Sequence, residues 1–168
     1  MSKEIVNFIN KLEGFKTAVK NLHWSSSSLS QHKLFDDVAD ALADFQDKVS
    51  EVYQSIAGRF KLNELKPVEY EISSPQKFLE DVLSATKEYY SHIKDLGDDY
   101  IGMRSDCEAY ISDLQRSQYL LDFTLKNELK ERLRESMKIN GKKIWINEDQ
   151  MFIQESLDEI KKEKIMNS

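Results

Sequence analysis

Apolar residues recur every three or four positions over most of the chain, which is the spacing of one face of an α-helix. Residues 2–23 carry the first such stripe, which consists of Ile5, Phe8, Ile9, Leu12, Phe15, Val19 and Leu22. Residues 29–58 carry the second, which consists of Leu34, Val38, Leu42, Phe45, Val49, Val52 and Ile56. The pattern predicts two long amphipathic helices. A serine run, residues 25–28, separates them, and one of these serines or Ser30 is expected to cap the second helix. Gly58 is its predicted C-terminal end.

Two further helices are predicted after a longer connection. Residues 59–74 lose the helical period and contain Pro67. Ser74 followed by Pro75 is typical of a capped helix start, and the Gly97-Asp98-Asp99 segment predicts a break. The apolar stripe of the third helix consists of Phe78, Leu79, Val82, Leu83, Tyr89, Tyr90, Ile93 and Leu96. That of the fourth consists of Met103, Cys107, Tyr110, Ile111, Leu114, Leu121 and Leu125.

The C-terminal segment is less regular. Asn140-Gly141 predicts a turn, residues 142–146 a short extended piece that contains Trp145, and residues from Asn147 onward a last helix with an apolar face. We therefore expect an all-α protein: a four-helix bundle over residues 1–126 with one longer crossover connection, and a C-terminal helical extension over residues 127–168. The extension is expected to pack on the bundle or on a neighbouring subunit.

Composition supports this class. Five glycines and two prolines in 168 residues, with 32% charged residues, disfavour sandwiches, barrels and Rossmann-type sheets. The single cysteine, Cys107, excludes an internal disulfide, indicates a reducing compartment and is expected to be a small buried hydrophobe. The first residues resemble neither a signal peptide nor a spanning segment, so a cytoplasmic protein without membrane contact is expected. A net charge of −6 is the wrong sign for broad binding to nucleic acid.

Common catalytic motifs are absent from the sequence: it contains no GxSxG elbow, no GxxxxGK[ST] loop, no CxxC and no HExxH. A di-iron site inside one bundle needs a Glu three residues before a His on two helices. None of the three histidines, His23, His32 and His92, follows such a Glu. That kind of intra-bundle site is therefore excluded.

A stripe of acidic residues on the second helix is the remaining candidate for chemistry. With His32 at zero and about 100° per residue, Asp36, Asp47 and Glu51 fall at about 40°, 60° and 100°. Asp40 lies within the same stripe, which points away from the predicted core. One interpretation is an ordinary solvated helix face. The other is a cation or a partner surface, because carboxylates on one stripe with few balancing cations repel one another.

The stretch that contains this stripe resembles the signature of Dps proteins, the bacterial mini-ferritins of the ferritin-like superfamily. It runs from Leu22 to Tyr53 and reads LHWSSSSLSQHKLFDDVADALADFQDKVSEVY. The family pattern has a His-Trp at the end of the first helix and a His at the start of the second. An acid follows four residues later, another eleven beyond it, and a Glu four after that. Here these positions are His23-Trp24, His32, Asp36, Asp47 and Glu51.

The resemblance implies a ferritin-like subunit that pairs about a two-fold axis. It implies that His23, His32 and Asp36 of one chain face Asp47 and Glu51 of the neighbour and bind iron, as a mono- or dinuclear site at the subunit interface. The implied function is oxidation of Fe(II) by peroxide or dioxygen, with iron storage or protection from oxidative stress. The implied assembly is a homo-oligomer, from a dimer to a shell of twelve subunits. Imidazoles with carboxylates suit ferrous iron.

The sequence also departs from the family. His23 and His32 are nine positions apart, about three fewer than is usual there, and since an extended residue spans roughly 3.3 Å, the shorter loop is expected to displace His23 by several ångströms. A lysine-rich tail is poorly matched, so DNA binding is not carried over. The segment from about Lys126 has no counterpart. The alternative function is a non-enzymatic ferritin-like structural or assembly protein with a degenerate or absent metal site; a DNA-compacting protein is less favoured.

Several other side chains have structural interpretations. His23 lies near the C-terminus of its helix, where a histidine can simply pack or interact with the helix dipole. Trp24 is expected to pack, and His92 to form a surface pair with Glu88, four residues before it. The tyrosines at helical spacing are expected in the core or an interface, with their hydroxyls at the edge; they are Tyr89, Tyr90, Tyr110 and Tyr119.

Overall fold

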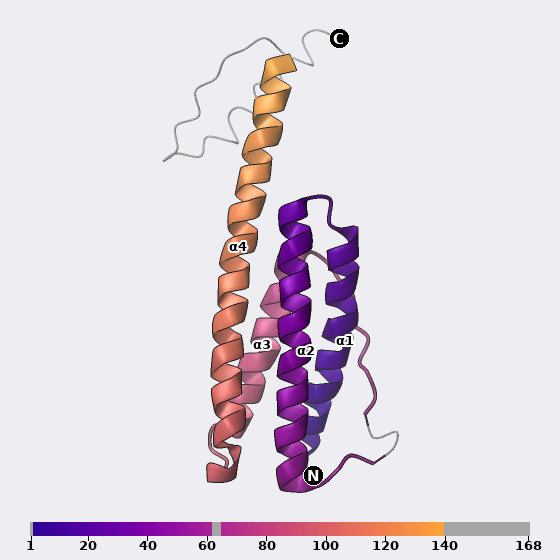
Figure 1. Cartoon of the computed structure of the whole chain (residues 1–168), viewed down its shortest axis with the longest axis vertical. Helices are drawn as coiled ribbons and strands as arrows, with labels where there is room; N and C mark the ends of the chain where they lie inside the picture. Colours follow the sequence, from indigo (N-terminus) through magenta and orange to yellow (C-terminus); the bar gives the residue numbers. More distant parts are fainter. Residues whose placement is uncertain (1, 62–64, 140–168) are drawn as a thin grey trace. The chain divides into compact units, whose positions relative to one another are not determined.

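Four long helices make up most of the described chain in the computed structural model (Figure 1). The structure describes residues 2–61 and 65–139, with side chains to residue 135. The helices are α1 (Lys3–Ser25), α2 (Leu29–Ala57), α3 (Pro75–Ile93) and α4 (Ile101–Ile139), and the short 3-10 helix η1 (Asp98–Tyr100) precedes α4. The described residues contain no strand. The four predicted helices are therefore confirmed, as is the all-helical class.

The helix ends lie where local chemistry predicts them. The Ser28 hydroxyl accepts a hydrogen bond from the Gln31 backbone N–H (3.2 Å), and the Ser74 hydroxyl accepts one from the Lys77 N–H (3.1 Å). Pro75 follows at the first position of α3. Gly58 ends α2 with a φ of 90°, a backbone conformation that glycine adopts without strain.

Contacts between side chains define the order and direction of the helices. Phe8 stacks on Tyr89 and Phe15 packs edge-on against Phe78, so α1 and α3 are antiparallel. α1 and α2 are also antiparallel. Gln46 of α2 is hydrogen-bonded to residues in the first half of α1, whereas His23 and His32 meet at the turn that joins the two helices. α2 and α3 therefore run in the same direction, and a long connection must return along the bundle. This is the predicted crossover.

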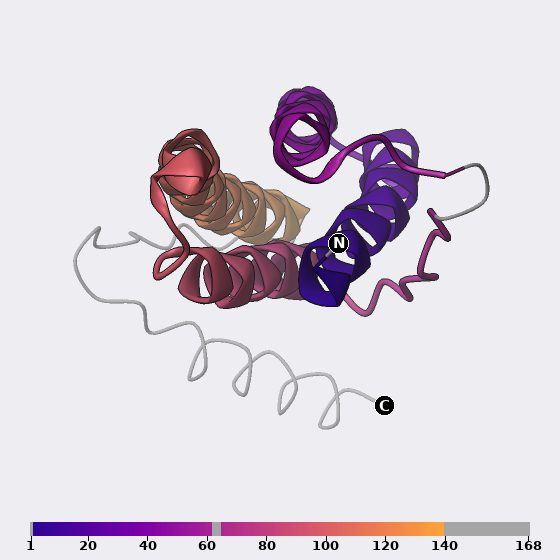
Figure 2. The ribbon, with the colours of Figure 1, turned by 90° about the horizontal axis from the view of Figure 1, so that it is seen from below.

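The part of the crossover that leads into α3, residues 65–74, lies against the outer side of α1 (Figure 2). The backbone N–H of Val68 donates to the Asn10 carbonyl (3.2 Å), and that of Lys66 donates to the Asn10 side-chain oxygen (2.7 Å). Further along, the Tyr70 ring packs edge-on against Phe15, with 5.0 Å between ring centroids. The connection is thus held to the bundle by hydrogen bonds and by aromatic packing.

The core lies between the four helices and consists of the predicted apolar stripes. Its largest fully buried side chains are Tyr53, Phe35, Phe78, Ile5, Ile9, Leu12, Leu42, Leu79, Ile93, Met103, Leu114 and Leu121. Cys107 is fully buried, as expected. The polar residue Gln46 is buried as well. Its side-chain NH2 group donates to the Ile9 carbonyl (3.2 Å) and to the Glu13 carboxylate (3.0 Å). The Lys16 ammonium donates to the side-chain oxygen of Gln46 (2.8 Å). This network links α1 to α2 and satisfies the buried amide.

The expectation that Trp24 packs within the chain is wrong, and Tyr119, which was expected in the core or an interface, does not lie in the core. Trp24 is 72% exposed and Tyr119 is 67% exposed. Each lies two positions from a buried leucine, Leu22 or Leu121. Two helical positions correspond to a turn of about 200°, so each aromatic ring points away from the core that its neighbour fills.

The predicted pair between His92 and Glu88 is also wrong. Glu88 lies 3.7 Å from the Lys11 ammonium on α1, and His92 Nε2 lies 3.4 Å from the Ser2 hydroxyl. Lys11 on α1, and Ser2 just before it, therefore take the place of the partners that the sequence indicated within α3.

Contacts divide the chain into two units, Met1–Glu128 and Leu129–Ser168. The domain boundary predicted after residue 126 falls inside α4, near this division. The predicted turn at Asn140-Gly141, the extended piece with Trp145 and the helix from Asn147 lie outside the described residues. None of the helices in the described part of the chain contains an apolar stretch long enough to cross a bilayer.

Candidate metal site

Two predicted ligands meet at the turn between α1 and α2. His23 lies in the last turn of α1 and His32 in the first turn of α2, with the serine turn between them. Their ring centroids are 3.9 Å apart and the rings are tilted by 30°. The shortened loop therefore still brings the two imidazoles into contact.

Reciprocal hydrogen bonds determine the tautomers of both rings. His23 Nδ1 lies 3.0 Å from the His32 carbonyl oxygen, and His32 Nδ1 lies 3.0 Å from the His23 carbonyl oxygen. A carbonyl oxygen only accepts, so Nδ1 must carry the proton in each neutral ring. Nε2 then keeps its lone pair. Metal-binding histidines are commonly arranged in this way, with one ring N–H bound to a carbonyl and the other nitrogen available to a metal.

Asp36 is the third predicted ligand near this turn. Its carboxylate lies 3.7 Å from His23 Nδ1, with 53% of its side chain exposed against 12% for His23. Asp36 therefore faces the protonated edge of the His23 ring. In this arrangement the carboxylate supports the orientation of His23, and its own exposed side chain must turn to meet a metal at Nε2.

Asp47 and Glu51 do not join this cluster within one chain. Both are exposed on the same helix, and at 1.5 Å per residue they lie about 16 and 22 Å along the axis from Asp36. In residues 2–61 and 65–135, no three His, Cys, Asp or Glu side chains are close enough together to hold a metal ion. The five predicted ligands thus form two groups: His23, His32 and Asp36 lie at the turn between α1 and α2, and Asp47 and Glu51 lie in the second half of α2.

The acidic face of α2, defined here as Asp36, Asp40, Asp44, Asp47 and Glu51, is solvent-exposed throughout. Asp44 pairs with Lys48 at 2.6 Å, and this hydrogen bond raises the Lys48 pKa. Among the described residues, Asp40, Asp47 and Glu51 form no ion pair. The face therefore keeps an unbalanced negative charge that a cation or a cationic surface would relieve.

Sequence reasoning missed an apolar residue on this face. Leu29 is 82% exposed, and at about 100° per residue it falls in the angular range of Asp36 and Asp47. Trp24 is exposed on the other side of the serine turn. The position of Leu29 in the same angular range as the acidic residues is the sequence signal that could have identified it. Large exposed apolar side chains beside a candidate site are typical of an interface.

Comparison with known proteins assigns no relationship. No protein-family model matches the sequence, and neither a curated protein nor a solved structure shows significant similarity to the chain.

Proposed function

We propose that the protein is a ferritin-like subunit that pairs through the acidic face of α2 and oxidises Fe(II) at sites shared between two subunits. The observation that carries the proposal is the His23–His32 pair, in which both Nδ1 atoms are bound to carbonyl oxygens and both Nε2 atoms keep their lone pairs. The bundle order, with one crossover between α2 and α3, is consistent with a ferritin-like arrangement.

The register of α2 supports completion of the site by a second copy. His32 and Glu51 lie equally far from the middle of the helix segment, near residues 41 and 42, and so do Asp36 and Asp47. Two antiparallel copies of α2 that cross at this level therefore place both pairs opposite each other at once. Each pairing yields two equivalent sites, because a two-fold interface repeats every contact.

The donor set fits ferrous iron. Imidazole nitrogens and carboxylate oxygens bind Fe(II), and the added negative charge of Asp47 and Glu51 favours the ferric product. Iron is the substrate, oxidised from Fe(II) to Fe(III). Two ferrous ions supply one electron each to hydrogen peroxide, whose O–O bond breaks, and two protons are taken up to form two water molecules. Dioxygen is the other candidate oxidant.

An anaerobic Fe(II) titration followed by hydrogen peroxide tests this function. The readout is the near-ultraviolet absorbance of the ferric product, with wild type and His32→Ala compared. We expect saturable oxidation that falls to the protein-free rate in His32→Ala. The matched control is His92→Ala, which removes an exposed histidine far from the site and should keep the wild-type rate. Equal rates for both variants, or a wild-type rate no faster than buffer, would contradict the proposal.

The acidic half of the site has its own test. Asp47→Asn with Glu51→Gln should abolish the saturable oxidation while circular dichroism stays unchanged. The charge-matched control is Asp95→Asn with Glu71→Gln, two exposed acids outside α2. Sedimentation of wild type should give a dimer or a larger particle. A monomer at micromolar concentration would contradict a shared site.

A second candidate is a ferritin-like assembly protein without iron chemistry. The exposure of Trp24 and Leu29 beside the turn favours it, since pairing would bury both side chains. This function predicts an oligomer that Leu29→Ser weakens, with Fe(II) oxidation no faster than in buffer. Oligomerisation together with His32-dependent oxidation would instead support the first proposal.

A further inference from the structure

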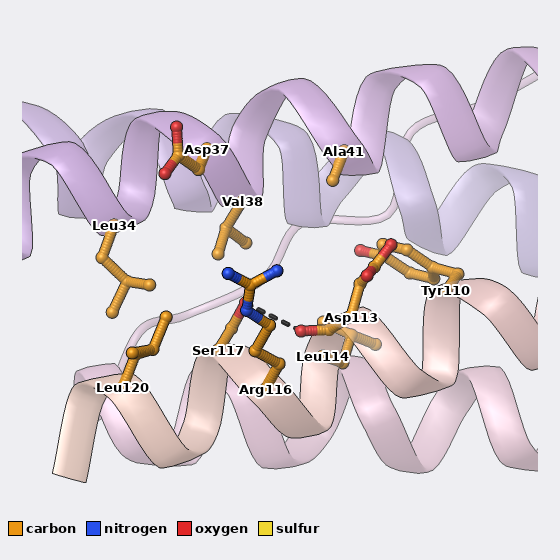
Figure 3. A pocket seen from close by; sticks show the side chains of 10 residues that line it. All are labelled: Leu34, Asp37, Val38, Ala41, Tyr110, Asp113, Leu114, Arg116, Ser117 and Leu120. Atoms are coloured by element: carbon orange, nitrogen blue, oxygen red, sulfur yellow. Dashed lines mark hydrogen bonds between the residues drawn. The ribbon is translucent and has the colours of Figure 1, made fainter. Parts of the chain in front are cut away.

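A groove of about 210 Å³ lies between α2 and α4, on a different face of α2 from the acidic face (Figure 3). Its apolar lining comes from both helices and consists of Leu34, Val38, Ala41, Leu114 and Leu120. The polar lining consists of Asp37, Tyr110, Asp113, Arg116 and Ser117. A concave apolar surface with a few polar groups is the usual form of a small-molecule site.

One buried polar atom in this groove has no partner. Tyr110 is 3% exposed and its ring stacks on Phe45, with 4.2 Å between centroids. Its hydroxyl oxygen forms no hydrogen bond within the described residues, and Figure 3 shows it on the groove side of the ring. Buried hydroxyls are nearly always hydrogen-bonded, because leaving one unpaired costs free energy. The unpaired hydroxyl therefore indicates a missing partner.

The protonation state of the Tyr110 hydroxyl indicates what kind of partner it can take. Burial, and to a smaller extent the Asp113 carboxylate, raises the pKa of the Tyr110 hydroxyl above its usual range. The group therefore keeps its proton at neutral pH and is available as a donor. A ligand with an acceptor, such as a carbonyl or ether oxygen, would satisfy this donor.

The remaining polar groups limit the charge of the ligand. The Ser117 hydroxyl already donates to the Asp113 carbonyl oxygen (2.9 Å). Asp37 and Asp113 carry two negative charges at the rim against the single positive charge of Arg116, which disfavours an anion. The Arg116 guanidinium extends into the middle of the groove (Figure 3) and forms no ion pair with any described residue. An exposed side chain without a partner rotates readily, so it can open the way to Tyr110.

We propose that this groove binds a small uncharged molecule with an apolar body and one acceptor oxygen, which accepts a hydrogen bond from Tyr110. The apolar body would contact the leucine and valine side chains of both helices. The proposal does not depend on the iron chemistry, because the groove and the histidine pair share no residue.

Amide NMR titrations of the full chain test the proposal with three probes. Acetophenone carries the acceptor oxygen, α-methylstyrene has the same shape with a CH2 group in its place, and benzoate is the anionic analogue. We expect saturable shifts at residues 34–41 and 110–120. Acetophenone should bind about 5- to 10-fold more tightly than α-methylstyrene, as one hydrogen bond to a buried donor allows, and benzoate should bind more weakly than acetophenone.

Tyr110→Phe should abolish the preference for acetophenone over α-methylstyrene and leave the binding of α-methylstyrene unchanged. The matched control is Tyr90→Phe, because the Tyr90 hydroxyl already donates to Glu108 outside the groove (2.6 Å). Tyr110→Phe should also unfold at the same denaturant concentration as wild type or at a higher one, since it removes no hydrogen bond. Absence of saturable shifts, persistence of the preference in Tyr110→Phe, or a lower unfolding midpoint would overturn the proposal.

Discussion

Gly14→Ala tests how the crossover is attached to the bundle. Gly14 lies in the interior of α1, where replacing glycine by alanine normally stabilises a helix by about 1 kcal/mol. In this structure, however, an added Cβ would overlap the backbone oxygen of Val68 and touch its carbonyl carbon. The obstacle is backbone on a neighbouring segment, so no side-chain rotation relieves it, and the crossover must move away from α1.

Moving the crossover breaks contacts whose contribution can be estimated. The Val68 and Lys66 amides lose their hydrogen bonds to Asn10, each with a net contribution of about 1 kcal/mol. The edge-on contact of Tyr70 with Phe15 contributes about 0.5–1.5 kcal/mol more. These contacts together contribute roughly 3 kcal/mol to stability. The higher helix propensity of alanine offsets about 1 kcal/mol of their loss. We expect a net destabilisation of about 2 kcal/mol.

Urea denaturation followed by circular dichroism measures this difference. The matched control is Gly102→Ala, another helical glycine, whose added Cβ would meet no atom within 4 Å. The stability of the control should be unchanged or raised by up to about 1 kcal/mol, whereas that of Gly14→Ala should fall. A Gly14→Ala protein as stable as wild type would show that the crossover does not pack against α1, and would refute the reasoning.

Two further predictions concern the cap of α3 and the buried thiol. Ser74→Ala should lower the free energy of unfolding by about 1 kcal/mol, because the backbone N–H of Lys77 loses its capping hydrogen bond. The control Ser73→Ala, at an exposed neighbouring position, should leave the free energy of unfolding unchanged. Equal effects of the two substitutions in urea denaturation would contradict the role of Ser74 as a cap. Burial, with smaller effects of neighbouring carboxylates, raises the pKa of Cys107 from 9.0 to about 12. Above pH 9 the unfolded chain therefore loses this proton while the folded chain keeps it, so stability should fall from pH 9 to about 12, by up to about 1.4 kcal/mol per pH unit for this group. Cys107→Ala should show a shallower decline over the same range, and an identical slope in both proteins would contradict the assignment.

The positions and ends of the helices could be predicted because their determinants are local. A stripe of apolar residues at helical spacing, a serine before the first turn and a glycine after the last act over a few residues. For this reason the sequence predicts Ser74 as the cap of α3 and Gly58 as the end of α2, whereas for α2 it predicts only a serine cap and the structure places it at Ser28. Likewise, the apolar stripes determined which side of each helix is buried, and the exposure of the acidic face of α2 followed from them.

Local spacing misleads where a side chain has neighbours on another helix. The spacing of His92 and Glu88 indicated a pair, but Lys11 on α1 is the partner of Glu88 in the packed bundle. Likewise, Trp24 is hydrophobic enough for a core, but its helical position directs it to solvent. The partner of Glu88 thus comes from a helix distant in sequence, whereas the exposure of Trp24 follows from its angular position two residues after the buried Leu22.

For the candidate sites, the sequence determined which residue types are present and on which helix face they lie. It could not determine that the rings of His23 and His32 touch and exchange hydrogen bonds with each other's backbone, because that depends on how the serine turn folds. Nor could it distinguish Tyr110 from the other core tyrosines. Only the distance between α2 and α4 decides that its hydroxyl reaches no partner, and distances between packed helices arise from the whole core rather than from any local pattern.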